Sequence, residues 1–299
     1  MFAHLVRTFR LVIVLLVALA VGALYTPTLD AAITTLSGAI AGARAPEDLS
    51  KVGATMEAAG VWYSLFYTAG RPGAATAPSP GLAGAALTSY AGQVPFTNPT
   101  AGQNSYIFRF DCTGSVAGKC RVIDRLWHNS GIVVTTTTAQ TVNSATLPAR
   151  DANGTTDGAG VMAALEVSTA TTNGSAITNT TISYTDQAGN AGNTATIASF
   201  PATAVAGTFV PFQLAAGDTG IRSIQSITLG TSYVAGTVHL VMYRDLVEDA
   251  TSIANVSPGR NAIEAGFVRL FDNTVPMLIW LPTATTAITI NGRIIYTQG

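Results

Sequence analysis

The stretch from residue 131 to residue 220 carries almost no charge, and it constrains the fold more than any other feature. Its only charged residues are Arg150, Asp151, Asp157, Glu166, Asp186 and Asp218. Runs of Thr and Val fill much of the rest, and these β-branched residues suit pleated strands better than helices. Gly and Asn clusters at 151–154, 172–174 and 187–190 supply the positions of positive φ that tight turns need. The pattern predicts an all-β fold with a neutral polar surface.

The strand pattern continues on both sides of this stretch. Short apolar or alternating segments separated by turn residues predict a β-sandwich or jelly-roll-like core of antiparallel strands over residues 105–299. The predicted strands are residues 106–111, 121–126, 132–138, 161–168, 180–184, 194–200, 209–214, 221–229, 237–244, 275–281 and 287–296. A short helix is expected at 258–264.

Residues 31–104 form a second region, predicted to be an extended arm with Pro/Gly-rich loops and one aromatic strand at 61–67. The sequence Ala45-Pro-Glu-Asp48 predicts a helical turn, because Pro suits the first position of a helix and acids suit its first turn. We expect the arm at 31–60 and the loops at 71–104 to contact neighbouring subunits.

Residues 1–30 form a hydrophobic N-terminal segment, expected to be helical. Arg7 and Arg10 precede an unbroken apolar run from 11 to 24, which is the layout of a secretory signal peptide or an anchor. The run is shorter than the roughly 20 residues of a membrane span. A start codon placed too far upstream is the alternative, and both explanations stay open.

Charge excludes one class of partner. Only 10% of the residues are charged, against about 25% in an average soluble domain, and the net charge is −1. Because no Lys/Arg-rich block is present, the cation cluster that nucleic-acid binding needs is missing from the sequence. Either hydroxyls and amides solvate the surface, or an assembly buries much of it, and we favour the assembly.

One segment carries the residue types of a nucleophilic triad, namely Asp124, His128 and Ser130. All three lie close together in sequence, whereas triad members converge from separate elements, and no Gly-x-Ser-x-Gly turn is present. We therefore expect Asp124 to pair locally with Arg125 while Trp127 packs in the core. The prediction is a protein without catalytic residues, and not an enzyme.

Metal and cofactor sites are not predicted either. His128 has one acid nearby and His239 has none, so neither shows a ligand set. The segment 151–158 resembles a calcium loop but lacks the later bidentate acid, which favours a polar turn. Four aromatic residues form a core or interface strand more readily than a sugar-binding face. They are Trp62, Tyr63, Phe66 and Tyr67.

The two cysteines, Cys112 and Cys120, flank a seven-residue loop between two predicted strands. They could face each other across a hairpin as a disulfide or remain as two free thiols. Two cysteines do not identify a compartment, so the sequence leaves both states open.

Extended phrases of the sequence resemble a family of structural proteins encoded near the head genes of tailed bacteriophages. They are Asp124-Arg-Leu-Trp-His-Asn-Ser-Gly131, Thr137-Thr-Ala-Gln-Thr-Val-Asn-Ser144, Pro148-Ala-Arg-Asp151, Glu166-Val-Ser-Thr-Ala170, Ile177-Thr-Asn-Thr-Thr-Ile-Ser-Tyr184, Ser199-Phe-Pro-Ala-Thr-Ala-Val-Ala-Gly207, Phe209-Val-Pro-Phe-Gln-Leu214, Gly217-Asp-Thr-Gly220, Leu270-Phe-Asp-Asn-Thr-Val-Pro276 and Ile295-Tyr-Thr-Gln-Gly299. The resemblance runs from about residue 33 to the C-terminus. Such proteins start near Ala32 or Ile33, without a hydrophobic leader.

The resemblance implies a virion component, expected to be a head decoration (cement) protein that binds the major capsid protein or other virion subunits as a symmetric oligomer, with a trimer as the working guess. It implies no cofactor, no nucleic acid, and no membrane unless residues 1–25 are a real anchor. The alternative is an exported, membrane-anchored bacterial surface β-domain, periplasmic or on the cell surface, that binds glycans or protein partners. A secreted β-fold hydrolase is the third hypothesis.

Overall fold

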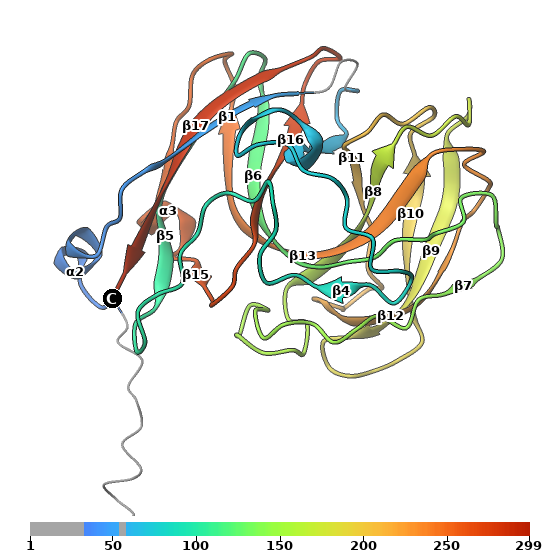
Figure 1. The fold of residues 1–299 in the computed structure, drawn as a ribbon, viewed down its shortest axis with the longest axis horizontal. Coiled ribbons are helices and arrows are strands. Elements are labelled where there is room, and N and C mark those ends of the chain that lie inside the picture. The colour runs from blue at the N-terminus through green and yellow to red at the C-terminus, as the bar shows by residue number, and fades with distance from the viewer. Residues whose placement is uncertain (1–32, 54–57) are drawn as a thin grey trace, which may run out of the picture.

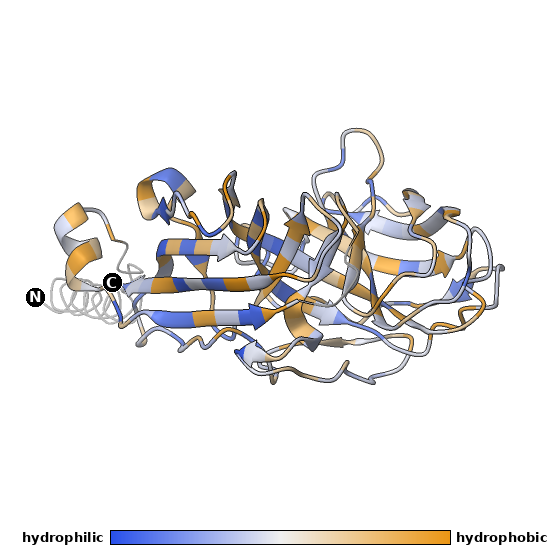
Figure 2. Cartoon of the chain, turned by 90° about the horizontal axis from the view of Figure 1, so that it is seen from above, coloured by the Kyte–Doolittle hydropathy of each residue, from blue (hydrophilic) through white to orange (hydrophobic). Residues whose placement is uncertain are grey.

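The computed structural model describes residues 33–53 and 58–299, and its regular secondary structure is almost entirely antiparallel β-strand (Figure 1 and Figure 2). The predicted all-β, antiparallel class is therefore confirmed. The prediction for the hydrophobic segment 1–30 lies outside the described residues.

Three sheets make up the fold, and each contains strands that are distant in sequence. The six-stranded sheet has the order β14 (Arg260–Asn261), β5 (Ser105–Gly114), β17 (Thr289–Gln298), β1 (Glu47–Val52) and β3 (Gly70–Arg71), with β15 (Arg269–Leu270) also paired to β5. The seven-stranded sheet has the order β13 (Thr237–Thr251), β8 (Val161–Thr169), β11 (Thr208–Pro211), β2 (Trp62–Ser64), β16 (Pro276–Pro282), β6 (Gly118–His128) and β4 (Ala85–Ala86). The four-stranded sheet has the order β10 (Asn193–Phe200), β9 (Ile177–Asp186), β12 (Ile221–Thr228) and β7 (Gln140–Thr141).

A further pairing of β13 with β6 closes the strands from β13 to β6 on themselves, and we call this closed part the ring. Apolar residues fill the ring, among them Phe66, Phe209 and Tyr243. A second core joins the six-stranded sheet to the ring, with Phe110 and Trp280 at its centre. A third core, which includes Leu165 and Tyr184, joins the ring to the four-stranded sheet. The ring thus lies between the two open sheets (Figure 1).

The N-terminal region differs from the prediction in two respects. The segment that starts at Ala45-Pro46 is not a helical turn, because residues 47–52 form β1, which pairs with β17 over its whole length. Region 31–104 contains four strands, β1 to β4, rather than one aromatic strand. The expected arm therefore runs along a sheet of its own chain. The only helices among the described residues are short, namely α2 (Leu36–Ala41), the 3-10 helix η1 (Leu65–Tyr67) and α3 (Ala262–Ala265).

Two strand predictions need correction. The segment 132–138 forms turns instead of a strand, because the side chain of Gln140 accepts a hydrogen bond from the Val133 amide at 2.8 Å and donates one to the Val133 carbonyl at 3.0 Å. These bonds replace the ladder that a strand would need. The predicted strand at 61–67 is shorter, since β2 ends at Ser64 and η1 follows. The other predicted strands are present with shifted ends.

Candidate functional site

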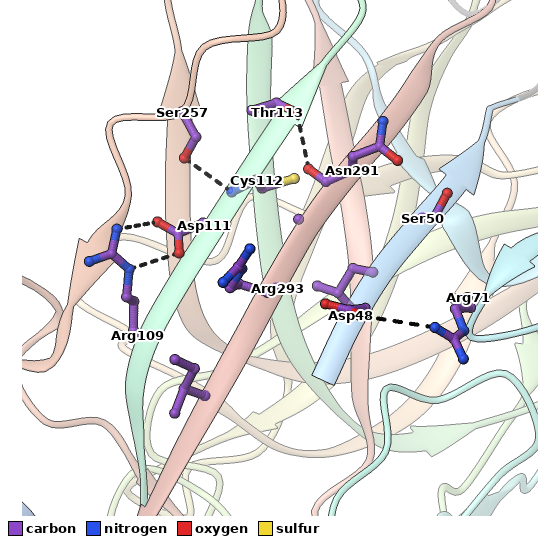
Figure 3. Close-up of a pocket in the computed structure, with 13 residues that line it drawn as sticks. Asp48, Ser50, Arg71, Arg109, Asp111, Cys112, Thr113, Ser257, Asn291 and Arg293 are labelled. Carbon is purple, nitrogen blue, oxygen red and sulfur yellow. Dashed lines mark hydrogen bonds and ion pairs between the residues drawn. The ribbon is translucent and has the colours of Figure 1, made fainter. Parts of the chain in front are cut away.

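A groove of about 870 Å³ on the open face of the six-stranded sheet collects charged side chains in a chain that has few of them (Figure 3). The strand register aligns Asp48 on β1 with Arg293 on β17, and Arg293 with Asp111 on β5. Arg109 binds the Asp111 carboxylate through two hydrogen bonds of 2.8 Å. Arg71 lies 4.0 Å from Asp48, so charges of opposite sign alternate across four strands.

The groove offers charge but no activated nucleophile among its described lining residues. The Ser257 hydroxyl donates to Asp249 at 2.6 Å and accepts from the Cys112 and Gly259 amides, so it acts as a clamp between chain segments. No histidine lines the groove. This cluster was not predicted from the sequence, although the spacing of Arg109 and Asp111 in a strand places both on one face.

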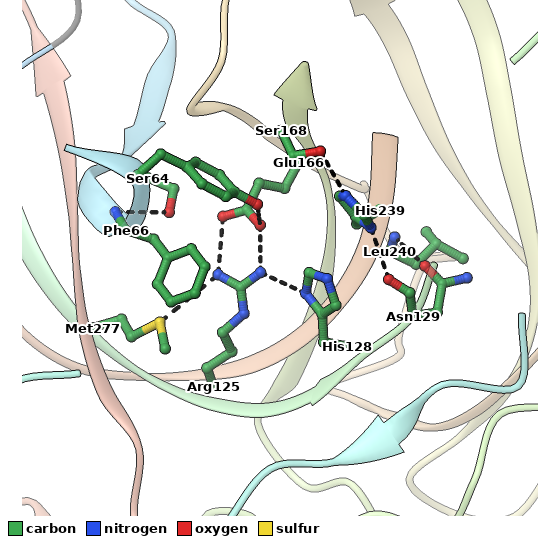
Figure 4. A network of polar contacts seen from close by, with 11 residues as sticks. Ser64, Phe66, Arg125, His128, Asn129, Glu166, Ser168, His239, Leu240 and Met277 are labelled. Atoms are coloured by element: carbon green, nitrogen blue, oxygen red, sulfur yellow. Dashed lines mark hydrogen bonds and ion pairs between the residues drawn. The ribbon is translucent and has the colours of Figure 1, made fainter. Parts of the chain in front are cut away.

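A buried polar network occupies the ring (Figure 4). Arg125 on β6 and Glu166 on β8 are both 0% exposed. The guanidinium donates to both carboxylate oxygens, at 2.9 Å to Oε1, and also to Nδ1 of His128 at 2.6 Å. The Tyr67 hydroxyl donates to Glu166 at 2.9 Å. Arg125 and Glu166 share strand faces with the apolar ring residues Ile123 and Ala164, which explains why they point inward.

Electrostatics hold Arg125 and Glu166 in their charged forms. Burial alone would raise the pKa of Glu166, but the charge and hydrogen bonds of Arg125 lower it below its ordinary value. Burial and the neighbouring Glu166 raise the pKa of the Tyr67 hydroxyl, which therefore stays protonated. Both oxygens of Glu166 are paired, while Nε of Arg125 is buried without a hydrogen-bond partner, and the arrangement is that of a structural ion pair rather than a proton-transfer centre.

The three residue types of a triad are not brought together. Asp124 pairs with Arg150 through two hydrogen bonds of 3.1 Å, and both residues are buried. His128 contacts Arg125, while the Ser130 hydroxyl accepts from the Gly81 amide at 2.8 Å. The expected local pair of Asp124 with Arg125 is wrong, because neighbouring residues of a strand point to opposite faces. Trp127 is fully buried, as expected.

The possible calcium loop is a polar turn. The Asp151 carboxylate accepts hydrogen bonds from four backbone amides and from the Thr155 hydroxyl, at 2.7–3.1 Å. These bonds lower the pKa of Asp151 although burial alone would raise it. Asp157 lies 3.2 Å from Arg222 instead of facing Asp151 as a second ligand. Within residues 33–53 and 58–299, no group of three or more His, Cys, Asp or Glu residues is arranged to bind a metal ion.

The aromatic segment is part of the interior of the ring. Tyr63 and Phe66 are buried, and Trp62 and Tyr67 are half-buried against the apolar residues of the ring. Arg121 covers the Trp62 ring at 4.5 Å from its centroid. The segment therefore presents no open aromatic face for a sugar.

Cys112 and Cys120 are free thiols, and both are buried. Cys112 lies on β5 of the six-stranded sheet and Cys120 on β6 of the ring, so the two thiols meet in the core between two sheets. Burial, followed by hydrogen bonding to Cys120, raises the pKa of the Cys112 thiol well above its ordinary value. The reactive thiolate is therefore strongly disfavoured.

We expect neither thiol to react with a water-soluble aromatic disulfide reagent in the folded chain at pH 8, because both are buried and Cys112 is protonated. Two thiols should react within minutes after unfolding in guanidinium chloride. The absorbance of the released aromatic thiolate gives the number of reactive thiols in the folded and in the unfolded chain. Rapid reaction of one thiol in the folded chain would contradict this placement.

The four-stranded sheet exposes an almost uncharged outer face. Of the six charged residues between 131 and 220, four are buried, and only Asp157 and Asp218 remain at least partly exposed. Strand register places small hydroxyl side chains side by side on the outer face, which we call the hydroxyl face. It contains Thr181, Ser183 and Thr185 of β9, Thr194 and Thr196 of β10, and Ser223, Ser226 and Thr228 of β12.

Comparisons with known proteins add only weak resemblance. No family model and no curated protein matches the chain. Among solved structures, the VP2 subviral particle of infectious bursal disease virus matches at 10% identity and a TM-score of 0.18, covering 85% of this chain and 81% of that chain. The structure of the Gt strain of that virus matches at 10% identity and a TM-score of 0.18, covering 86% of this chain and 81% of that chain. Scores this low carry no argument about function. No helix in the described part of the chain has the length and hydropathy to cross a membrane.

Proposed function

We propose that this chain is a non-enzymatic structural component of a tailed-phage virion, a decoration protein that stabilises the head as a homo-oligomer, with a trimer as the specific expectation. The hydroxyl face and the charge-poor surface around it carry the proposal. Interface cores are depleted in charged residues, and a symmetric assembly repeats one such surface in every subunit. The resemblance of the sequence to phage head-gene products points in the same direction.

The architecture suits a load-bearing role. One core fills the ring and two more join it to an open sheet on each side, and their buried, packed side chains leave little room for movement. The polar groups inside the ring are engaged with each other instead of with a ligand. Neither feature is needed for transient binding, and both fit a particle that must resist mechanical stress.

Size-exclusion chromatography with light scattering on residues 31–299 tests the proposal. We expect a closed oligomer. Ser183→Arg should raise its dissociation constant at least tenfold, because the substitution places a charge in the centre of the hydroxyl face. The matched control is Thr113→Arg, which makes the same change on a half-buried hydroxyl position of the six-stranded sheet. A monomeric chain, or equal effects of the two variants, would contradict the proposal.

The location of the protein is tested separately. A virion component should copurify with particles and bind empty heads, whereas an exported surface domain should be cleaved or anchored through residues 11–24. Mass spectrometry of the N-terminus of the natural protein distinguishes these outcomes.

A further inference from the structure

The hydrogen bonds inside the ring fix the protonation state of two buried histidines. His128 is 0% exposed and His239 is 3% exposed, and their ring centroids lie 4.6 Å apart (Figure 4). A guanidinium can only donate, so Nδ1 of His128 must accept from Arg125 at 2.6 Å. His128 is therefore a neutral ring with its proton on Nε2, a buried atom that makes no direct hydrogen bond within the described chain.

His239 is neutral in the opposite tautomer. A carbonyl can only accept, so Nδ1 of His239 carries the proton that is donated to the Asn129 carbonyl at 2.8 Å. Its Nε2 then accepts from the Ser168 hydroxyl at 2.7 Å. Neither ring has a free acceptor for a second proton while these bonds are made.

No carboxylate is free to receive a positive charge on either ring. The groups that face the pair are Arg125 of β6, Glu166 of β8 and Tyr67 of η1. Both oxygens of Glu166 already accept from Arg125, and one accepts from Tyr67 as well. A proton on Nδ1 of His128 would oppose the N–H of Arg125 in a site without water-exposed atoms, so this contact would have to break.

The segment that covers His128 is the loop of residues 78–84, which we call the strap. It is held to the end of β6 by a few hydrogen bonds. The Gly81 amide donates to Ser130, the Ser130 amide donates to the Gly81 carbonyl at 2.9 Å, and Asn129 donates to the Leu82 carbonyl at 3.3 Å. Trp127 donates to the Ala83 carbonyl at 3.1 Å. Trp127, Asn129 and Ser130 lie within two residues of His128, so a displaced His128 would disturb the bonds that they make to the strap.

We propose that the His128–His239 pair is an acid-sensitive latch, and that acidification protonates it and detaches the strap from β6 before the rest of the fold opens. The inference goes beyond the proposed virion function and does not depend on it. Burial, followed by the charge of Arg125, lowers the pKa of His128, and burial lowers that of His239, in agreement with the geometry.

The sign of the pH dependence follows from this. Above the ordinary histidine pKa of about 6.5 both the latched and the detached states are neutral, and the latch is fully stable. As the pH falls below that value, His128 and His239 bind protons in the detached state but stay neutral in the latched state. The equilibrium then moves toward detachment by up to tenfold per pH unit for each histidine, or about 30-fold for one histidine at pH 5.

Hydrogen exchange measured by mass spectrometry at pH 7.5 and 5.0, corrected for intrinsic rates, tests the latch. We expect exchange of the Gly81 and Ser130 amides, which bond between the strap and the end of β6, to increase at least tenfold at pH 5.0, while β9 and β10 stay protected. The double variant His128→Gln/His239→Gln keeps a donor and an acceptor at each position but cannot titrate, so its exchange should not depend on pH in this way. Unchanged exchange in the natural chain, uniform loss of protection, or an acid response that persists in the variant would overturn the proposal.

A second measurement works even if the variant does not fold. Nitrogen-15 NMR of labelled histidine at pH 7.5 should show one neutral ring protonated on Nε2 and one protonated on Nδ1, in addition to the signal of His4. A charged ring for His128 or His239, or the same tautomer for both, would overturn the proposal.

Discussion

Replacing Glu166 by glutamine is expected to lower the free energy of unfolding by about 3–5 kcal/mol, because Arg125 would keep its charge inside the ring without a counter-charge. The Arg125 side chain is 1% exposed and that of Glu166 is 0% exposed, so water cannot replace the lost partner. Glutamine preserves the shape and one acceptor oxygen, which isolates the effect of charge. Equilibrium unfolding in urea at pH 7.5 measures the change.

Two controls make this expectation specific. Asp157→Asn removes the same charge from an exposed pair with Arg222, whose side chains are 51% and 46% exposed, and should cost less than about 1 kcal/mol. Replacing both ring residues, Arg125→Met with Glu166→Leu, should recover most of the lost stability, because no unpaired charge remains. If Glu166→Gln costs no more than Asp157→Asn, the ring does not hold Arg125 in a water-free site.

Trp280→Ala is expected to destabilise the chain by about 3–5 kcal/mol, since it leaves a large cavity in the core between the six-stranded sheet and the ring. Trp280 is fully buried on β16 and lies over two glycines at the crossing from β5 to β6. A Cβ atom at Gly114 or Gly118 would lie 2.5 or 2.4 Å from the indole ring. A Cβ atom would also meet the Val116 carbonyl at 2.9 Å from Gly114 and the Leu281 carbonyl at 2.5 Å from Gly118, so the indole and the backbone together leave room only for glycine.

A double-mutant cycle checks this packing. Gly114→Ala alone should cost about 1–3 kcal/mol through overpacking against Trp280. In the Trp280→Ala background the added methyl group no longer meets the indole and keeps only its contact with the Val116 carbonyl, so the same change should cost less. Equal costs of Gly114→Ala in both backgrounds would show that the indole ring does not determine the glycine.

The strands that could be predicted from sequence are those with local signals. Segments such as 161–168 and 221–229 combine β-branched residues with flanking turns, and both are strands in the structure. β1 could not be predicted, because its Pro and acidic residues resemble a helix start and its pairing partner β17 lies over 200 residues away. Long-range pairing outweighed local propensity there.

The polar contacts were less predictable than the strands. Arg125 and Glu166 lie 41 residues apart, and Asp124 and Arg150 lie 26 apart, so only the fold brings each pair together. The alternation of side chains along a strand does exclude a pair between Asp124 and Arg125, and this signal was available in the sequence. The hydroxyl face, in contrast, follows from alternating Thr and Ser residues, five of them in the charge-poor stretch and three just after it, at Ser223, Ser226 and Thr228.

The position of β17 has a consequence for synthesis of the protein. It is the last described strand to leave the ribosome, yet it lies between β5 and β1 in the six-stranded sheet. Until it emerges, β1 and β5 expose unpaired backbone groups along their facing edges, a state that favours pairing with other nascent chains. Ribosome-bound chains that lack β17 should therefore depend on chaperones far more than the completed protein does.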